Sequence, residues 1–226
     1  MSNIEKRHIV ELLDLISGFI NITDPPLKWE EINIKIRTLA KYINISNSMK
    51  LLLSTTGSIT KSLEILAEAP VFIQTIFQNI SNLKSINTDL NNEIITKNFK
   101  EISKLLQHFK IYENDELNFR EVWIRDFKNK YVFAISITPI KYLRDEFKKD
   151  LIQADIPIGK LIDKYKIECR REISNISWIK YSHLKDLNIE WNDLNLESKI
   201  PYRVYNLINN KEILMTIIEF FNPKIF

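Results

Sequence analysis

Strand-like segments are grouped together in the second half of the chain, and this grouping most constrains the fold. From Leu117 onward, β-branched and aromatic residues predict two hairpins, over residues 119–138 and 202–221. A further strand is expected over residues 167–183. Strands that gather with strands, rather than alternating with helices, indicate an antiparallel sheet. The sequence therefore predicts the α+β class, an antiparallel sheet with flanking helices.

The first 46 residues predict two helices. Apolar residues share one helical face over residues 4–20, and they step by three and four over residues 29–43. Asp24, Pro25 and Pro26 interrupt the pattern between them. We expect a helical hairpin over residues 1–46, either an appendage or a cover for one face of the sheet, followed by a main domain over residues 47–226.

The middle of the chain mixes helix and strand signals. Ser58 can cap a helix that runs through Leu66, and residues 71–77 predict a strand. Helical spacing is also found over residues 99–109 and 142–151. A short helix is expected to begin near Ile158.

Composition excludes several classes of function. The 226 residues carry a net charge of +3, and charges of both signs are mixed along the chain. The sequence therefore lacks the strong excess of clustered basic residues that is usual in nucleic-acid-binding domains. The single cysteine and three scattered histidines predict no disulfide and no metal site, and no glycine-rich nucleotide motif is present. No apolar run approaches the ~20 residues of a membrane span. We expect no cofactor and a location in the cytoplasm, or in the plastid stroma if the gene is plastid-encoded.

Two of the three glycines, Gly57 and Gly159, lie in the short segments 55–60 and 156–160. A chain this poor in glycine uses it where positive φ or close backbone approach requires it. These segments therefore predict backbone brought close to a small ligand, including Ser58 in the first segment. The alternative is two ordinary turns.

Arg120 enters a predicted strand and shares one strand face with Val122 and Ile124. It is either an arginine that reaches solvent from the strand end or a buried cation that pairs with an anion. The pattern alone favours the first interpretation.

Glu219 shares a strand face with Ile217 and Phe221. A carboxyl group among such neighbours loses water, which raises its pKa toward the range useful for proton transfer. The alternative is a glutamate on an edge strand that reaches solvent. Arg203 and Arg170 are candidates for further cations, although adjacent arginines such as Arg170 and Arg171 usually belong to a solvated strand face.

Taken in chain order, these segments resemble the chorismate pyruvate-lyase family, above all its branch from archaea, actinobacteria, cyanobacteria and algal plastids. The resemblance covers about residues 50–223. The matching segments are Leu52-Leu53, Gly57-Ser58-Ile59-Thr60-Lys61 with Glu64, Arg120-Glu121-Val122, residues 134–139, Ile156-Pro157-Ile158-Gly159, Glu168-Cys169-Arg170-Arg171-Glu172, Tyr202-Arg203-Val204-Tyr205 and Glu219-Phe220-Phe221.

The resemblance implies a chorismate lyase-like domain over residues 47–226 with a small enclosed site. Arg120 would hold the ring carboxylate, helped by backbone N–H groups of Ile59 and Ile158, and Glu219 would meet the oxygen at the other end of the ring. Predicted binding residues beside these are Ser58, Gly159, Arg203 and Arg170. The implied reaction is elimination of pyruvate from chorismate to give 4-hydroxybenzoate, without a cofactor, for plastoquinone-type quinone biosynthesis.

Two other classes of function remain open. Effector domains of some transcription regulators resemble this fold and bind small ligands without catalysis. A regulator of that kind needs a basic DNA-binding unit, whereas residues 1–46 hold six basic and six acidic residues. This balance of charges does not argue against a sensor that acts without a DNA-binding unit. The N-terminal helices are also candidates for docking a partner protein.

Overall fold

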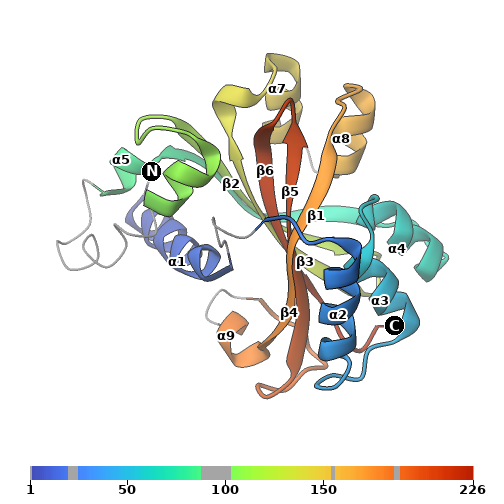
Figure 1. Ribbon diagram of the computed structural model, residues 1–226. Coiled ribbons are helices and arrows are strands. Elements are labelled where there is room, and N and C mark those ends of the chain that lie inside the picture. The colour runs from blue at the N-terminus through green and yellow to red at the C-terminus, as the bar shows by residue number, and fades with distance from the viewer. Residues whose placement is uncertain (1, 20–24, 88–102, 154–155, 186–188, 226) are drawn as a thin grey trace.

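The computed structural model describes residues 2–19, 25–87, 103–153, 156–185 and 189–225. Within these residues, six strands form one antiparallel sheet in the order β1-β2-β3-β6-β5-β4 (Figure 1). The strands are β1 Phe72–Asn82, β2 Glu116–Arg125, β3 Lys130–Pro139, β4 Arg170–Lys180, β5 Lys199–Asn209 and β6 Glu212–Phe221. The predicted α+β fold with an antiparallel sheet is confirmed.

Both predicted hairpins form, β2 with β3 and β5 with β6. The second is tighter than the sequence suggested, because only Asn210 and Lys211 separate its strands. Both residues have positive φ, at 48° and 70°, as the two-residue turns that match the twist of paired strands require. This turn fixes which residues of β5 and β6 lie opposite each other.

Helices cover both faces of the sheet (Figure 1). One face, called the α1 face, is covered by α1 Asn3–Phe19, α5 Leu83–Asn87, the helical residues 103–109 and α9 Tyr181–Lys185. The other face, called the α4 face, is covered by α2 Trp29–Leu39, α3 Asn47–Ser54, α4 Ile59–Ala67, α7 Asp145–Gln153 and α8 Ile158–Lys164. A short 3-10 helix, η1 Ile140–Tyr142, follows β3.

The two N-terminal helices lie on opposite faces of the sheet. Ile9, Leu12 and Ile16 of α1 are buried in the core of the α1 face, whereas Ile32 and Ile36 of α2 are buried in the core of the α4 face. Each helix therefore covers one face of the sheet, and neither is an appendage. The predicted helical hairpin is wrong, because the two apolar stripes pack against opposite faces of the sheet and not against one shared face. The division of the chain at residue 46 stays a prediction.

Local sequence signals explain the other helices. The Ser58 hydroxyl accepts a hydrogen bond from the backbone N–H of Lys61 and caps α4 as expected, and Ser46 caps α3 in the same way. The helix predicted over residues 99–109 is present from residue 103, and its first part lies outside the described residues. A helix begins at Ile158, as the sequence predicted.

Candidate functional site

A cavity lies on the α4 face between the sheet and the first turns of α4 and α8. Its volume, counted to its open mouth, is about 550 Å³. The lining residues come from the starts of two helices and from all six strands, and they are Ser58, Ile59, Thr60, Ile73, Arg120, Val122, Ile124, Ala134, Ser136, Pro157, Ile158, Gly159, Arg171, Tyr205, Ile217 and Glu219.

Strand register explains the shape of this cavity. Arg120 lies opposite Ser136, which lies opposite Ile217, and the next row on the same face is Val122, Ala134 and Glu219. Arg120 and Glu219 therefore occupy diagonal corners of a patch that spans three strands, about 10 Å across at the usual strand spacing. The small side chains of Ala134 and Ser136 lie between them and leave room above the middle strand.

Arg120 is buried, with 1% of its surface exposed. Nη2 donates to the Thr75 hydroxyl at 3.3 Å and Nη1 to the Ile156 carbonyl at 3.5 Å. The interpretation as an arginine that reaches solvent is therefore wrong. The guanidinium lines a cavity that is largely shielded from water. It therefore attracts an anion more strongly there than it would at the protein surface.

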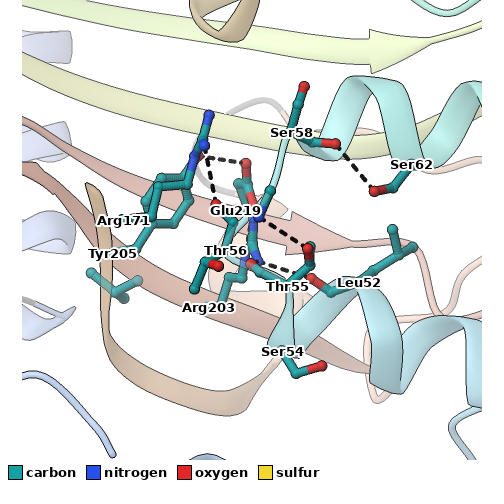
Figure 2. A network of polar contacts seen from close by, with 12 residues as sticks. Leu52, Ser54, Thr55, Thr56, Ser58, Ser62, Arg171, Arg203, Tyr205 and Glu219 are labelled. Atoms are coloured by element: carbon teal, nitrogen blue, oxygen red, sulfur yellow. Dashed lines mark hydrogen bonds and ion pairs between the residues drawn. The ribbon is translucent and has the colours of Figure 1, made fainter. Parts of the chain in front are cut away.

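Glu219 is also buried, and β6 is an interior strand between β3 and β5. The alternative of an edge-strand glutamate is therefore wrong. The carboxylate has polar partners that the apolar pattern did not predict (Figure 2). Oε2 accepts a hydrogen bond from Arg203 Nε at 2.6 Å, and Oε1 accepts one from the Tyr205 hydroxyl at 3.0 Å.

Arg203 lies behind Glu219 and is absent from the cavity lining, so the structure does not place it as a binding cation. It is fully buried, and Nη1 donates to the carbonyls of Leu52 at 2.9 Å and Thr55 at 2.5 Å. These carbonyls belong to the C-terminal end of α3, where the helix dipole favours a cation. Arg203 thus joins Glu219 to the segment that leads into α4.

Tyr205 reaches the cavity from β5, two residues along from Arg203, and lies opposite Ile217. Burial raises the pKa of its phenol well above the ordinary value, and the charge of Glu219 acts in the same direction. The phenol therefore stays protonated and donates its hydrogen to the carboxylate. The guanidinium carbon of Arg203 lies 4.8 Å from the centre of its ring.

Arg171, and not Arg170, reaches the cavity from β4. Because neighbouring residues of a strand point to opposite faces, only one of the two can line it. Arg170 is exposed and pairs with Glu172. Arg171 Nη1 donates to the carbonyl of Thr56 at 3.1 Å, so a second arginine holds the segment before α4.

The first turns of α4 and α8 meet at the cavity and bring Ser58, Ile59, Ile158 and Gly159 to its wall, as predicted. The first N–H groups of a helix lack partners within the helix and suit an anion. A Cβ added to Gly159 would lie 3.0 Å from Ser58 Oγ, and none of the described glycines has positive φ. Close packing of the two helix ends, not backbone conformation, therefore requires this glycine.

No cluster of three or more His, Cys, Asp or Glu side chains suited to a metal ion occurs among the described residues. Among the same residues, no helix is long and apolar enough to cross a membrane.

Sequence reasoning missed Tyr205, Ala134 and Ser136, and it named Arg170 as the binding residue where Arg171 lines the cavity. Ala134 and Ser136 had a visible signal, because two small residues alternate on one face of a strand rich in larger apolar side chains. Tyr205 lies two residues after Arg203 in β5. Because alternate residues of a strand point to the same face, the strand pattern places both side chains on one face.

A buried arginine and a buried glutamate thus line one cavity on the sheet of an α+β fold. Residues 53–226 match the family described as "Chorismate pyruvate-lyase Rv2949c-like". The chain belongs to this family.

A curated relative from Methanocaldococcus jannaschii, named "Putative lyase MJ0807", is 35% identical over 193 residues, which cover 83% of this chain and 84% of the relative. Together with the family match, this relative supports a lyase role for the chain.

Solved structures with a similar arrangement include the effector domain of PhnF from Mycobacterium smegmatis, with a TM-score of 0.49 and 6% identity over 74% of this chain and 90% of that one. Another is gene product SA0254 from Staphylococcus aureus, with a TM-score of 0.47 and 11% identity over 74% of this chain and 89% of that one.

Proposed function

We propose that the protein is a lyase that eliminates pyruvate from chorismate and releases 4-hydroxybenzoate. The observation that carries this proposal is the placement of Arg120 and Glu219, both buried, at diagonal corners of one cavity. The family match supports the same reaction class.

The charges of the cavity suit such a substrate. Chorismate carries two carboxylates, and arginine's planar guanidinium binds a carboxylate through two parallel hydrogen bonds. Arg120 would hold the ring carboxylate, while the backbone N–H groups of Ile59 and Ile158 would donate to it from the two helix ends. Arg171 is a further cation at the wall.

The elimination transfers a proton and needs no external oxidant or reductant. The bond between ring carbon 3 and the enolpyruvyl oxygen breaks, and ring carbon 4 loses its hydrogen as a proton, whose electron pair completes the aromatic ring. The methylene carbon of the released enolate gains one proton and becomes the methyl group of pyruvate. Glu219, beside the hydroxyl end of the ring, is placed to assist this transfer, an effect worth about 10²- to 10⁴-fold.

The family resemblance suggests where the product is used. We propose that 4-hydroxybenzoate is supplied to the biosynthesis of a plastoquinone-type quinone, in the cytoplasm or the plastid stroma.

Purified protein incubated with chorismate tests the proposed reaction. We expect 4-hydroxybenzoate and pyruvate to appear in equal amounts, with Arg120→Ala abolishing detectable binding of 4-hydroxybenzoate. Glu219→Gln should still bind 4-hydroxybenzoate but turn over about 10²- to 10⁴-fold more slowly. Tight binding of 4-hydroxybenzoate without turnover by the unmodified protein would contradict the lyase and favour a non-catalytic sensing module.

A further inference from the structure

Glu219 is held on both of its oxygens by donors from the same neighbouring strand. Arg203 lies directly opposite it in the β5–β6 register, and Tyr205 is the next residue of β5 on the same face. The two distances are 2.6 Å for Arg203 Nε to Oε2 and 3.0 Å for the Tyr205 hydroxyl to Oε1. The pairing therefore leaves little freedom for the carboxylate to turn away from the cavity.

The partners of this carboxyl group favour its ionised form. A guanidinium donates only, and the buried charge of Arg203 is neutralised at 2.6 Å when Glu219 is negative. Burial keeps the phenol of Tyr205 protonated, and a hydrogen bond from a phenol is stronger to a carboxylate oxygen than to a neutral carboxyl oxygen. Both contacts are therefore strongest when Glu219 is ionised.

Arg203 itself is fixed from behind. The carbonyls of Leu52 and Thr55 hold Nη1 at the C-terminal end of α3, and no surface of Arg203 is exposed. The aromatic ring of Tyr205 adds a cation–π contact at 4.8 Å. The cation therefore remains beside Glu219 whether or not a ligand fills the cavity.

We propose that Tyr205 and Arg203 are positioning residues that keep Glu219 as an ionised carboxylate aimed into the cavity, so that it accepts a hydrogen bond or a proton from the ligand and never acts first as an acid. This proposal rests on the proposed function. In the elimination, Glu219 accepts the proton lost from ring carbon 4. The proton that the enolate methylene gains is then that same proton returned by Glu219, or one from water.

The charged and titratable groups around Glu219 come from three strands and two helices. Arg203 and Tyr205 contact it from β5, and Arg171 of β4 and Arg120 of β2 line the same cavity. Outside the lining, Lys61 of α4 and Asp163 of α8 form an exposed pair at 2.7 Å. Burial raises the pKa of Tyr205, so its phenol stays protonated as a donor to Glu219.

Tyr205→Phe is the sharpest test, because it removes one donor and keeps the ring beside Arg203. Because a hydrogen bond to a charged group contributes substantially to its positioning, we expect kcat of Tyr205→Phe to fall about tenfold to hundredfold. KM should stay within about threefold of the unmodified value. Substitutions of Arg203 are less informative, because they leave a buried charge unpaired and endanger folding.

Tyr202→Phe is the matched control. Tyr202 lies on β5 and is buried on the α1 face, where its hydroxyl accepts from Asn175 Nδ2 at 3.3 Å. The same chemical change there should leave kcat and KM as in the unmodified protein. An unchanged kcat in Tyr205→Phe would overturn the proposal, and so would equal effects of the two variants.

Failure of the proposed function is distinguishable from failure of this inference. If the unmodified protein does not convert chorismate, calorimetric binding of 4-hydroxybenzoate and of benzoate replaces the rate measurement. The preference for the hydroxylated ligand should be smaller in Tyr205→Phe than in the unmodified protein, because the carboxylate is held less firmly toward the ligand hydroxyl, whereas Tyr202→Phe should keep it. An equal preference in Tyr205→Phe and in the unmodified protein would overturn the inference.

Discussion

The neighbouring residues Arg120 and Glu121 of β2 point to opposite faces of the sheet, and both are 1% exposed. On the α4 face, the buried carboxylate is Glu219, and both of its oxygens accept hydrogen bonds. On the α1 face, the buried carboxylate is Glu121, and only Oε2 has a partner among the described residues, His8 Nε2 at 3.1 Å. One face therefore holds its carboxylate with a permanent cation, and the other with a histidine that titrates.

This difference separates two uses of a buried charge. The Glu219 network lines a cavity and is enclosed by α3, α4 and the sheet. The Glu121 pair instead fastens α1 to the sheet, and the His8 ring also packs edge-on against Phe77 with 4.6 Å between ring centres. We expect the first to control chemistry and the second to control how α1 is held.

The largest expected effect comes from matched changes of the two glutamates. Glu219→Gln should lower kcat for chorismate about 10²- to 10⁴-fold, because it removes the proton acceptor in the cavity. Glu121→Gln should leave kcat within about threefold, since it changes only the α1 face. Steady-state kinetics at one pH measures both. Equal losses in the two variants would show that the faces do not have separate roles.

His108 makes the α1 face sensitive to acid. It contacts Thr216 Oγ1 at 2.8 Å, and burial lowers its pKa from 6.5 to about 4. Between these values the unfolded chain binds more protons, so stability falls as pH falls, by up to about 3 kcal/mol once pH is below the lowered pKa. Urea unfolding of His108→Gln should lack this part of the acid dependence, whereas the exposed His183→Gln should keep it. An unaltered acid dependence in His108→Gln would contradict this reasoning.

The glycines give a smaller effect. Gly159→Ala should push against Ser58 Oγ, 3.0 Å away, and should raise KM by several-fold while lowering stability by about 1 kcal/mol. Gly18 in α1 has open space around the added Cβ, so Gly18→Ala should stabilise the helix by up to about 1 kcal/mol without changing KM. Kinetics and urea unfolding of both variants test this contrast. A normal KM in Gly159→Ala would show that the helix ends tolerate separation.

His8 gives the smallest effect and the opposite sign to His108. Its hydrogen bond to Glu121 raises the pKa of His8 above 6.5. The pair therefore stabilises the fold fully below pH 6.5 and loses this contribution as pH rises through the raised pKa, by less than about 1 kcal/mol because the histidine is partly exposed. His8→Gln should remove the difference in stability between pH 6 and pH 9 that this pair supplies. If this difference in stability persists in His8→Gln, the attachment of α1 to the sheet does not depend on the histidine.

The sequence predicted the sheet and its two hairpins because strand signals are local. Strand alternation also placed Arg120 with Val122, and Glu219 with Ile217, on faces that the structure confirms. It could not choose between Arg170 and Arg171, since polar residues occupy both faces of that strand end and give no apolar marker.

Other features depend on long-range packing. The apolar stripes of α1 and α2 indicate that each helix has one buried side, but they do not indicate which face of the sheet it packs against. The contact between Arg203 and Glu219 depends on the β5–β6 register, which the turn at Asn210 and Lys211 fixes. A loop one residue longer or shorter would have placed a different residue opposite Glu219.

The most direct measurement is a crystal structure of the protein with 4-hydroxybenzoate bound. The account predicts the carboxylate of the ligand at Arg120 and the first turns of α4 and α8, and its hydroxyl within hydrogen-bond distance of Glu219, with the Tyr205 and Arg203 contacts retained. A ligand outside this cavity, or one bound with its carboxylate at the Glu219 end, would contradict it.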